Sequence, residues 1–232
     1  MSSDIVNERF FEALITGDRP AARALIKEQR ESGLTAQDLI TELFWPTYEL
    51  VDRLFRNDQL STISHNFATR LLRALADQTA AEIVPQNPNG RTVLAACGPN
   101  EGEELGAQMA IDLLESYGFR MSFCGGGVAS DELMAQVNQW QPDVVLMFCS
   151  APADLPGIRG LIDTLREHGA ASNTQIVVGG GVFNRAEGLA EEIGADLWAE
   201  HPLDLVDLML AEPETRATPD QRTVGRVRRK AA

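Results

Sequence analysis

The chain has 232 residues, of which 44% are hydrophobic and 23% charged, a composition typical of globular proteins rather than disordered or fibrous ones. No run of eighteen apolar residues occurs, and the first residues lack a basic segment followed by an apolar one. We therefore expect neither a membrane span nor a signal peptide. The net charge is −14, and the acidity lies in the body, because the residues from Glu212 onward hold six basic and three acidic side chains. An acidic body repels nucleic acid, so such a contact would have to use this tail.

The first 84 residues show apolar side chains at helical spacing and no strand pattern, which predicts four helices. Thr35 and Asp38 resemble a capping box that opens the longest helical segment. Pro46 lies inside this segment and predicts a kink or break there. Short connections between amphipathic helices favour an antiparallel bundle. The four segments begin near Val6, Asp18, Thr35 and Ser61.

The segment Pro85–Gly90 has turn chemistry throughout and is the expected linker. Beyond it, strand-like and helical patterns alternate, which predicts a doubly wound parallel sheet of five strands covered by helices on both faces. The domains would be 1–84 and 91–211, followed by a disordered basic tail at 212–232. Strands are expected at 92–97, 119–124, 143–149, 175–178 and 195–199, and helices near 104–117, 130–140, 155–168, 185–193 and 203–210.

The stretch from Arg91 to Gly106 reads as a strand, a tight loop and a helix start, the place where open α/β domains bind a ligand. Glu101, Glu103 and Glu104 crowd this helix start. Acids there favour the helix dipole, or they form a carboxylate cluster on the ligand face; in either case the loop repels phosphate. The glycine runs 125–127 and 179–181 fit close approach of a large flat ligand and tight turns equally well.

A helical bundle, a linker and a flavodoxin-like five-stranded domain resemble the layout of the cobalamin-binding proteins. The resemblance covers about residues 1–211. It extends to the methionine-synthase-type module and, more closely, to the light-sensing domain of cobalamin-dependent MerR-type repressors. Segments of this sequence stand where the family has Asp/Glu-x-His-x-x-Gly, Ser-x-Leu and Gly-Gly, and the bundle resembles the repressor pattern around an upper-face histidine, His65. The corresponding residues are Glu101, Glu103, Gly106, Phe148, Ser150, Gly179, Gly180, His65 and, where the repressors have tryptophan, Phe55.

Two departures from the family pattern concern the lower face of the cofactor. Glu103 stands where the family has the histidine that ligates cobalt, and a carboxylate oxygen is a poor substitute for imidazole on that metal. Phe148 stands where the family has the serine of the slot for the nucleotide tail, and its ring would fill such a slot. Together they argue against cobalt held by a protein histidine and leave open base-on binding, with the tail folded under the corrin.

Three cysteines and one histidine have alternative interpretations. Cys97, Cys124 and Cys149 each end a predicted strand; they are small buried hydrophobic residues or a soft-metal or redox site without paired spacing. His65 is an interhelical or surface residue on its own pattern, and a metal ligand by the resemblance. Three widely separated cysteines also make no disulfide framework, which favours a reducing cytoplasm.

These observations predict a non-catalytic, cytoplasmic sensor or regulatory protein that binds cobalamin, base-on or weakly, in a cleft between the bundle and the sheet edge. One alternative is a degenerate module that has lost cobalamin and acts through protein contacts. Another is a site for a different tetrapyrrole or a metal, using His65 or the thiols. A protein partner, a homo-oligomer and a tetrapyrrole ligand are the expected partners, with no membrane contact and nucleic acid only through the tail.

Overall fold

The computed structural model describes residues 3–98, 104–167, 173–218 and 221. The chain divides into two compact units, Met1–Pro85 and Gln86–Ala232, and the boundary falls beside the expected linker. None of the helices in the described ranges is long and apolar enough to cross a membrane.

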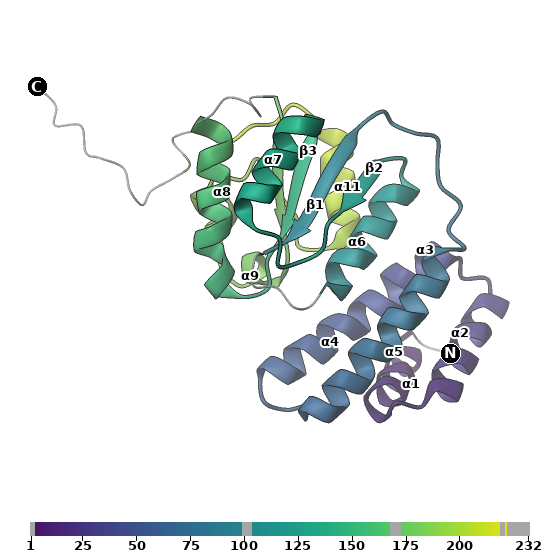
Figure 1. Ribbon diagram of the computed structural model, residues 1–232. Coiled ribbons are helices and arrows are strands. Elements are labelled where there is room, and N and C mark those ends of the chain that lie inside the picture. The colour runs from purple at the N-terminus through teal and green to yellow at the C-terminus, as the bar shows by residue number, and fades with distance from the viewer. Residues whose placement is uncertain (1–2, 99–103, 168–172, 219–220, 222–232) are drawn as a thin grey trace, which may run out of the picture. The chain divides into compact units, whose positions relative to one another are not determined.

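The first unit is helical (Figure 1). Its elements are α1 (Ser3–Thr16), α2 (Arg19–Glu31), α3 (Ala36–Asp38), η1 (Leu39–Phe44), α4 (Trp45–Arg56) and α5 (Thr62–Ala80). Helix α1 packs against α2, α4 and α5. The fully buried rings of Phe10 and Phe44 stack in the core with centroids 5.5 Å apart. The capping box predicted at Thr35 and Asp38 is present, because each side chain accepts from the other residue's backbone amide.

The helix departs from regular α geometry next to Pro46, where a kink or break was predicted, but it does not end there. The chain runs as a π-helix over η1 and returns to α-helix at Trp45, so that Pro46 stands in the first turn of α4. Proline lacks an amide proton and its ring clashes with the carbonyl four residues earlier. The wider π turn, in which the Trp45 amide donates to Ile40, accommodates both effects without ending the helical path.

The second unit is a five-stranded parallel sheet in the order β2-β1-β3-β4-β5, which confirms the predicted α/β, flavodoxin-like class. The strands are β1 (Thr92–Cys97), β2 (Arg120–Phe123), β3 (Val144–Phe148), β4 (Gln175–Gly179) and β5 (Leu197–Trp198). The helices are α6 (Leu105–Ser116), α7 (Ser130–Trp140), η2 (Pro152–Asp154), α8 (Leu155–Glu167), α9 (Gly181–Asn184), α10 (Leu189–Ile193) and α11 (Pro202–Ala211).

Helices cover both faces of this sheet, with α6 and α11 on one side and α7 and α8 on the other (Figure 1). The central strand β3 is buried at every position. Because strand side chains alternate between faces, Val145 and Met147 join the core beneath α7 and α8, whereas Leu146 and Phe148 point to the α6 side. The continuous apolar runs in the sequence thus reflect burial on both faces.

Two expectations for the second unit are wrong. The helix expected at 185–193 forms only over its second half, as α10, because Gly188 just before it has a φ of 77° in the left-handed region; the preceding helix α9 already ends at Asn184. Residues 212–218, expected to be disordered, are held by the end of the sheet. Gln175 Nε2 donates to the carbonyls of Glu212 and Thr215, and the Ala217 amide donates to Asp196. Polar composition predicted disorder there, but buried polar groups of the sheet use this segment's backbone as a partner.

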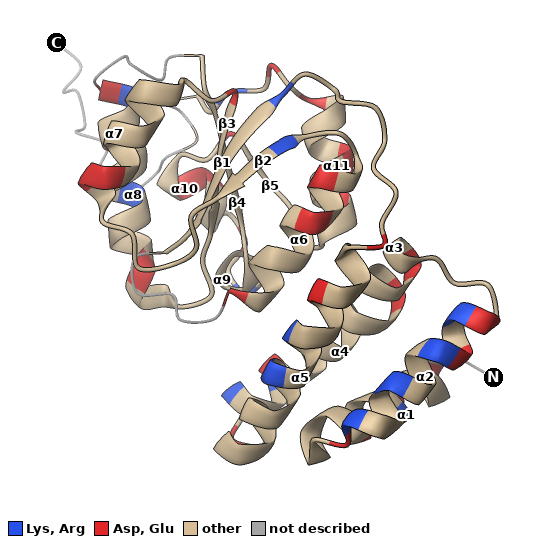
Figure 2. Cartoon of the chain, turned by 45° about the vertical axis from the view of Figure 1, so that its right-hand side comes forward, with Lys and Arg blue, Asp and Glu red and all other residues tan. Residues whose placement is uncertain are grey.

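Charge is unevenly spread over the helices (Figure 2). Helix α2 carries four basic and two acidic side chains, and Arg19, Arg23 and Lys27 are exposed on it. A basic helix in a protein with a net charge of −14 was not predicted from the sequence, where only the tail stood out as basic.

Candidate functional site

The carboxyl ends of β1 and β3 meet where the strand order reverses, since the chain leaves β1 toward β2 on one side and β3 toward β4 on the other. Open α/β sheets bind ligands outside this point. The backbone pairing continues past the strand ends, where Gly98 donates to the Phe148 carbonyl at 2.8 Å and Cys149 donates to the Gly179 carbonyl at 2.9 Å. These hydrogen bonds fix the backbone just beyond the ends of β1, β3 and β4.

Four of the predicted site residues lie together at the ends of β3 and β4. Phe148 is 8% exposed and paired with Gly179, and a Cβ on Gly179 would stand 3.4 Å from its ring. Ser150 comes two residues later, and its carbonyl accepts from Arg185 Nη2 at 2.6 Å. Gly180 begins the turn into α9. The Phe148 ring therefore occupies space at this edge that glycine at position 179 leaves open.

The glycine runs are explained by the protein's own packing. Gly180 has a φ of 105°, and a Cβ there would lie 2.4 Å from the Cys149 carbonyl oxygen. Gly125 has a φ of 73°, and a Cβ there would lie 2.6 Å from an oxygen of Glu104. Of the two interpretations weighed from the sequence, the tight-turn interpretation accounts for both positions.

The acidic loop is described only in part. Glu101 and Glu103 lie outside the described residues. Glu104 Oε1 accepts from the Gly126 amide at 2.7 Å and so ties the start of α6 to the loop after β2. Gly106 is buried in the first turn of α6. The described member of the cluster thus has a structural role between two strand ends.

The three thiols do not gather into one site. Cys97 and Cys149 are buried, and strand alternation directs them to opposite faces of the sheet. Cys124 is exposed and its thiol donates to the Ala95 carbonyl at 3.1 Å. Although part of the side chain reaches the surface, the thiol itself is partly desolvated, and this desolvation, together with the nearby charge of Glu104, raises the pKa of Cys124 and favours the protonated form. Within the described ranges, no group of three or more histidine, cysteine or acidic residues is arranged to hold a metal ion.

His65 and Phe55 come together inside the helical unit. His65 on α5 is 5% exposed, and its ring stacks on that of Phe55 in α4 with centroids 3.9 Å apart and an interplanar angle of 18°. The His65 carbonyl accepts from the Thr69 hydroxyl. The imidazole of His65 thus lies in a contact between α4 and α5. Its neighbour there is Phe55, the residue that stands where the resembling repressors have tryptophan.

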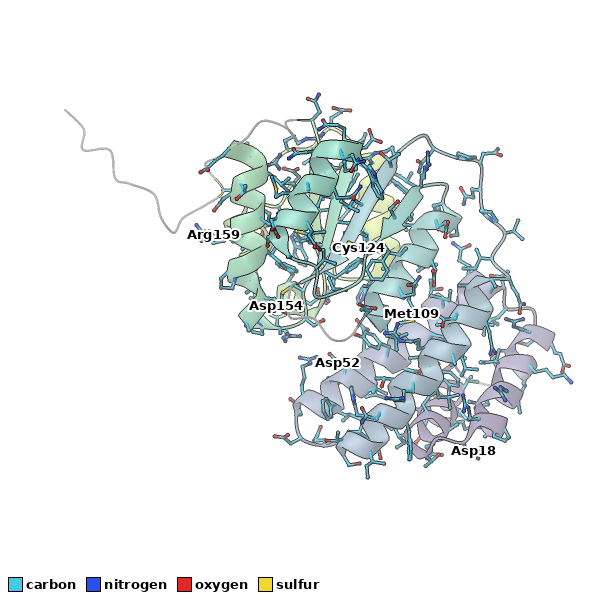
Figure 3. All side chains as sticks on the ribbon, viewed as in Figure 1. Asp18, Asp52, Met109, Cys124, Asp154 and Arg159 are labelled. Atoms are coloured by element: carbon cyan, nitrogen blue, oxygen red, sulfur yellow. The ribbon has the colours of Figure 1, made fainter. Side chains whose placement is uncertain are left out.

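One residue at the sheet edge was missed by sequence reasoning. Asp154 ends the turn η2 after β3 and is fully buried beside Gly98, where a Cβ would lie 2.9 Å from the Asp154 Cβ (Figure 3). Neither oxygen of its carboxylate has a hydrogen-bond partner in the described part of the chain. An aspartate just before a helical pattern normally indicates an N-cap, so the sequence carried no signal of this burial.

Comparison with known proteins gives matches to both units. Residues 91–207 match the B12 binding domain, and residues 6–78 match a second family also described as a B12 binding domain. Dimethylamine corrinoid protein 1 of Methanosarcina acetivorans is 23% identical over 214 residues, which covers 89% of this chain and 96% of that protein.

Two solved structures share the fold. The monomethylamine corrinoid protein of Methanosarcina barkeri superposes with a TM-score of 0.79 at 16% identity, covering 90% of this chain and 99% of that one. A chain of the methanol:cobalamin methyltransferase complex of the same organism gives 0.50 at 16% identity, with coverages of 92% and 82%. The family predicted from the motifs, and cobalamin as its cofactor class, are thereby confirmed. With half of its length matched by the first domain alone, the chain belongs to the B12 binding domain family.

Proposed function

We propose that the chain is a non-catalytic corrinoid-binding protein with a sensor or regulatory role, which binds cobalamin at the carboxyl edge of its sheet and acts on a protein partner. The observation that carries this proposal is the pair of B12-binding matches at residues 6–78 and 91–207. A protein partner is supported by the solved methyltransferase complex, in which a chain of this fold is found with other subunits.

The described residues at the sheet edge suit the neutral parts of a corrinoid. A corrin is a broad, largely apolar ring with carboxamide groups on its rim. Phe148 supplies an apolar surface at the end of β3, and the Asp154 carboxylate supplies acceptors for amide N–H groups. When bound, the corrinoid would supply a coloured cobalt centre that can exchange ligands. The chain's own residues would orient the ring and exclude water from it.

A lower cobalt ligand from the loop after β1 is not part of this proposal. Glu103 stands at the position that carries histidine in the resembling proteins, and carboxylate oxygen suits hard cations rather than this cobalt. We expect the cobalt(II) form, examined by electron paramagnetic resonance, to show no nitrogen coupling from a protein imidazole on its lower face. A histidine nitrogen signal that disappears when one histidine is replaced would refute this expectation.

A second candidate function is a carrier of methyl groups for a methyltransferase. It is favoured by the similarity to dimethylamine corrinoid protein 1 of Methanosarcina acetivorans, which aligns with this chain over 96% of its own length. A third candidate is a degenerate module that acts through protein contacts alone. The three differ in whether a corrinoid binds and in how the protein responds when the upper ligand of the cobalt is changed.

The test is an absorption titration of the purified protein with hydroxocobalamin and, separately, with haem. We expect the protein to bind hydroxocobalamin and not haem. Failure to bind either supports the degenerate module, and selective binding of haem points to another tetrapyrrole. If His65 acts as an upper ligand, His65→Gln should abolish the spectral change on binding, whereas His201→Gln, at the exposed start of α11, should leave it intact.

The sensor and carrier roles are then separated with adenosylcobalamin. A sensor loaded in the dark should change its oligomeric state or partner binding after illumination, as followed by size-exclusion chromatography. A carrier should show no such change but should accept and release methyl groups when reduced in the presence of a methyl donor. Release of methyl groups together with an unchanged oligomeric state would overturn the sensor role.

A further inference from the structure

Asp154 is the most deeply buried acidic side chain at the carboxyl edge of the sheet, among the residues that the structure describes. Its exposed fraction is 0%, and no atom in the described ranges hydrogen-bonds to its Oδ1 or Oδ2. Burying an ionised carboxylate without a partner is strongly unfavourable. A ligand that donates hydrogen bonds to these oxygens would offset this cost.

The usual structural roles of such an aspartate are not fulfilled here. Asp154 immediately precedes the 13-residue helix α8, where an aspartate normally accepts from the first helical amides, but neither of its oxygens does so. The carboxylates of Asp163 and Asp196 pair with the two arginines of α8. Arg185 lies at the same edge, but its guanidinium donates to the Ser150 carbonyl.

The position of Asp154 coincides with the point where the strand order reverses. A Cβ on Gly98 would meet the Asp154 Oδ2 at 3.2 Å, so the carboxylate lies directly against the end of β1. Open α/β sheets bind ligands outside this point, so the carboxylate stands at the expected ligand edge. Asp154 also immediately precedes the amino-terminal end of α8, where the helix dipole favours a negative charge.

We infer that Asp154 determines which corrinoid the chain accepts, by binding amide N–H groups of the ligand and excluding its phosphodiester. The inference rests on the proposed corrinoid binding. The rim of a corrin carries carboxamides, which donate hydrogen bonds to a carboxylate. The nucleotide tail of cobalamin carries a phosphodiester anion, which a buried carboxylate repels. The chain should therefore prefer a corrinoid without a nucleotide tail.

The test compares two ligands on three proteins. Diaquocobinamide, which lacks the tail, and hydroxocobalamin are titrated by absorption into the wild type, Asp154→Asn and Asp163→Asn. The wild type should bind diaquocobinamide more tightly. Asp154→Asn should shift the ratio of the two dissociation constants toward cobalamin by about tenfold or more, the effect of removing a unit charge near a phosphate at intermediate dielectric. Asp163→Asn makes the same charge change on the partly exposed side of α8 and should leave the ratio unchanged.

Each outcome decides between the two proposals. A wild type that prefers hydroxocobalamin, or an Asp154→Asn protein with an unchanged ratio, overturns the role of Asp154 while corrinoid binding stands. Binding of neither ligand by the wild type overturns corrinoid binding itself. If Asp154→Asn does not fold, the preference of the wild type between the two ligands still tests the role of Asp154. The ratio of dissociation constants is then measured on Asp154→Ser, which also removes the charge.

Discussion

The ring of Phe148 gives a prediction in which stability and binding are linked. Phe148 is 8% exposed at the end of β3 and lies against the backbone of Gly179 in β4. Replacing a buried phenylalanine by alanine removes transfer free energy and leaves a cavity, at a cost of about 3–5 kcal/mol. Because the ring is at the strand end, where neighbouring loops adjust, we expect Phe148→Ala to cost about 3 kcal/mol, at the lower end of that range.

Urea unfolding of the α/β unit measures this cost. With Trp45 replaced by Phe, the fluorescence of Trp140 and Trp198 reports on that unit alone. Leu203→Ala in α11 is the matched control, because that side chain belongs to the same unit, is 39% exposed, and should cost about 1 kcal/mol or less when removed. A loss below about 1 kcal/mol for Phe148→Ala would show that the ring does not fill a packed site.

The same site predicts a non-additive effect on cobalamin binding. Glu103→His alone should do little while the Phe148 ring remains, and Phe148→Ser alone opens a cavity without supplying a cobalt ligand. The double variant should bind aquocobalamin more tightly than the two single changes predict, because the imidazole and the opened space act on one ligand. If the wild type binds aquocobalamin with micromolar affinity and the double variant binds no more tightly, the argument that the Phe148 ring fills the slot for the nucleotide tail is refuted.

Three further predictions concern stability of the α/β unit. Gly180→Ala should destabilise it by several kcal/mol or prevent folding, since φ is 105° and the new Cβ would lie 2.4 Å from the Cys149 carbonyl oxygen; normal expression and melting would contradict this. Gly160→Ala, in α8 with nothing within 4 Å of the new Cβ, should raise stability by about 0.5–1 kcal/mol, and a lower melting temperature would refute it. Burial tends to raise the pKa of Asp143, but two hydrogen bonds from Thr92 and the charge of Arg91 outweigh it and lower the pKa, so its stabilisation is present above about pH 4 and is lost as the pH falls through the lowered value. Asp143→Asn should flatten this acid-side loss in urea unfolding, and an unchanged pH dependence would contradict the assignment.

Periodicity in the sequence predicted most of the fold because the side chains that produce it are the ones that are buried. The strands near 92, 143 and 175 were found from continuous apolar runs, which follow directly from burial on both faces. The prediction of helices and strands failed where local chemistry competes with the hydrophobic pattern. The helix expected at 185–193 begins only after Gly188, which lies in the left-handed region, and the polar residues 212–218 are ordered by partners far away in sequence.

The candidate site was less predictable, because the state of a site residue depends on atoms that the sequence does not place next to it. The motif spacing correctly grouped Phe148, Ser150 and Gly180, since all three lie at strand ends that are fixed by sheet order. Asp154 was not singled out, because an aspartate just before a helical pattern looks like an ordinary helix cap. Its burial beside Gly98 of another strand, and the lack of hydrogen-bond partners for its oxygens among the described residues, are visible only in the structure. A family motif therefore locates the ligand edge, whereas selectivity among corrinoids depends on an acidic residue outside the motif.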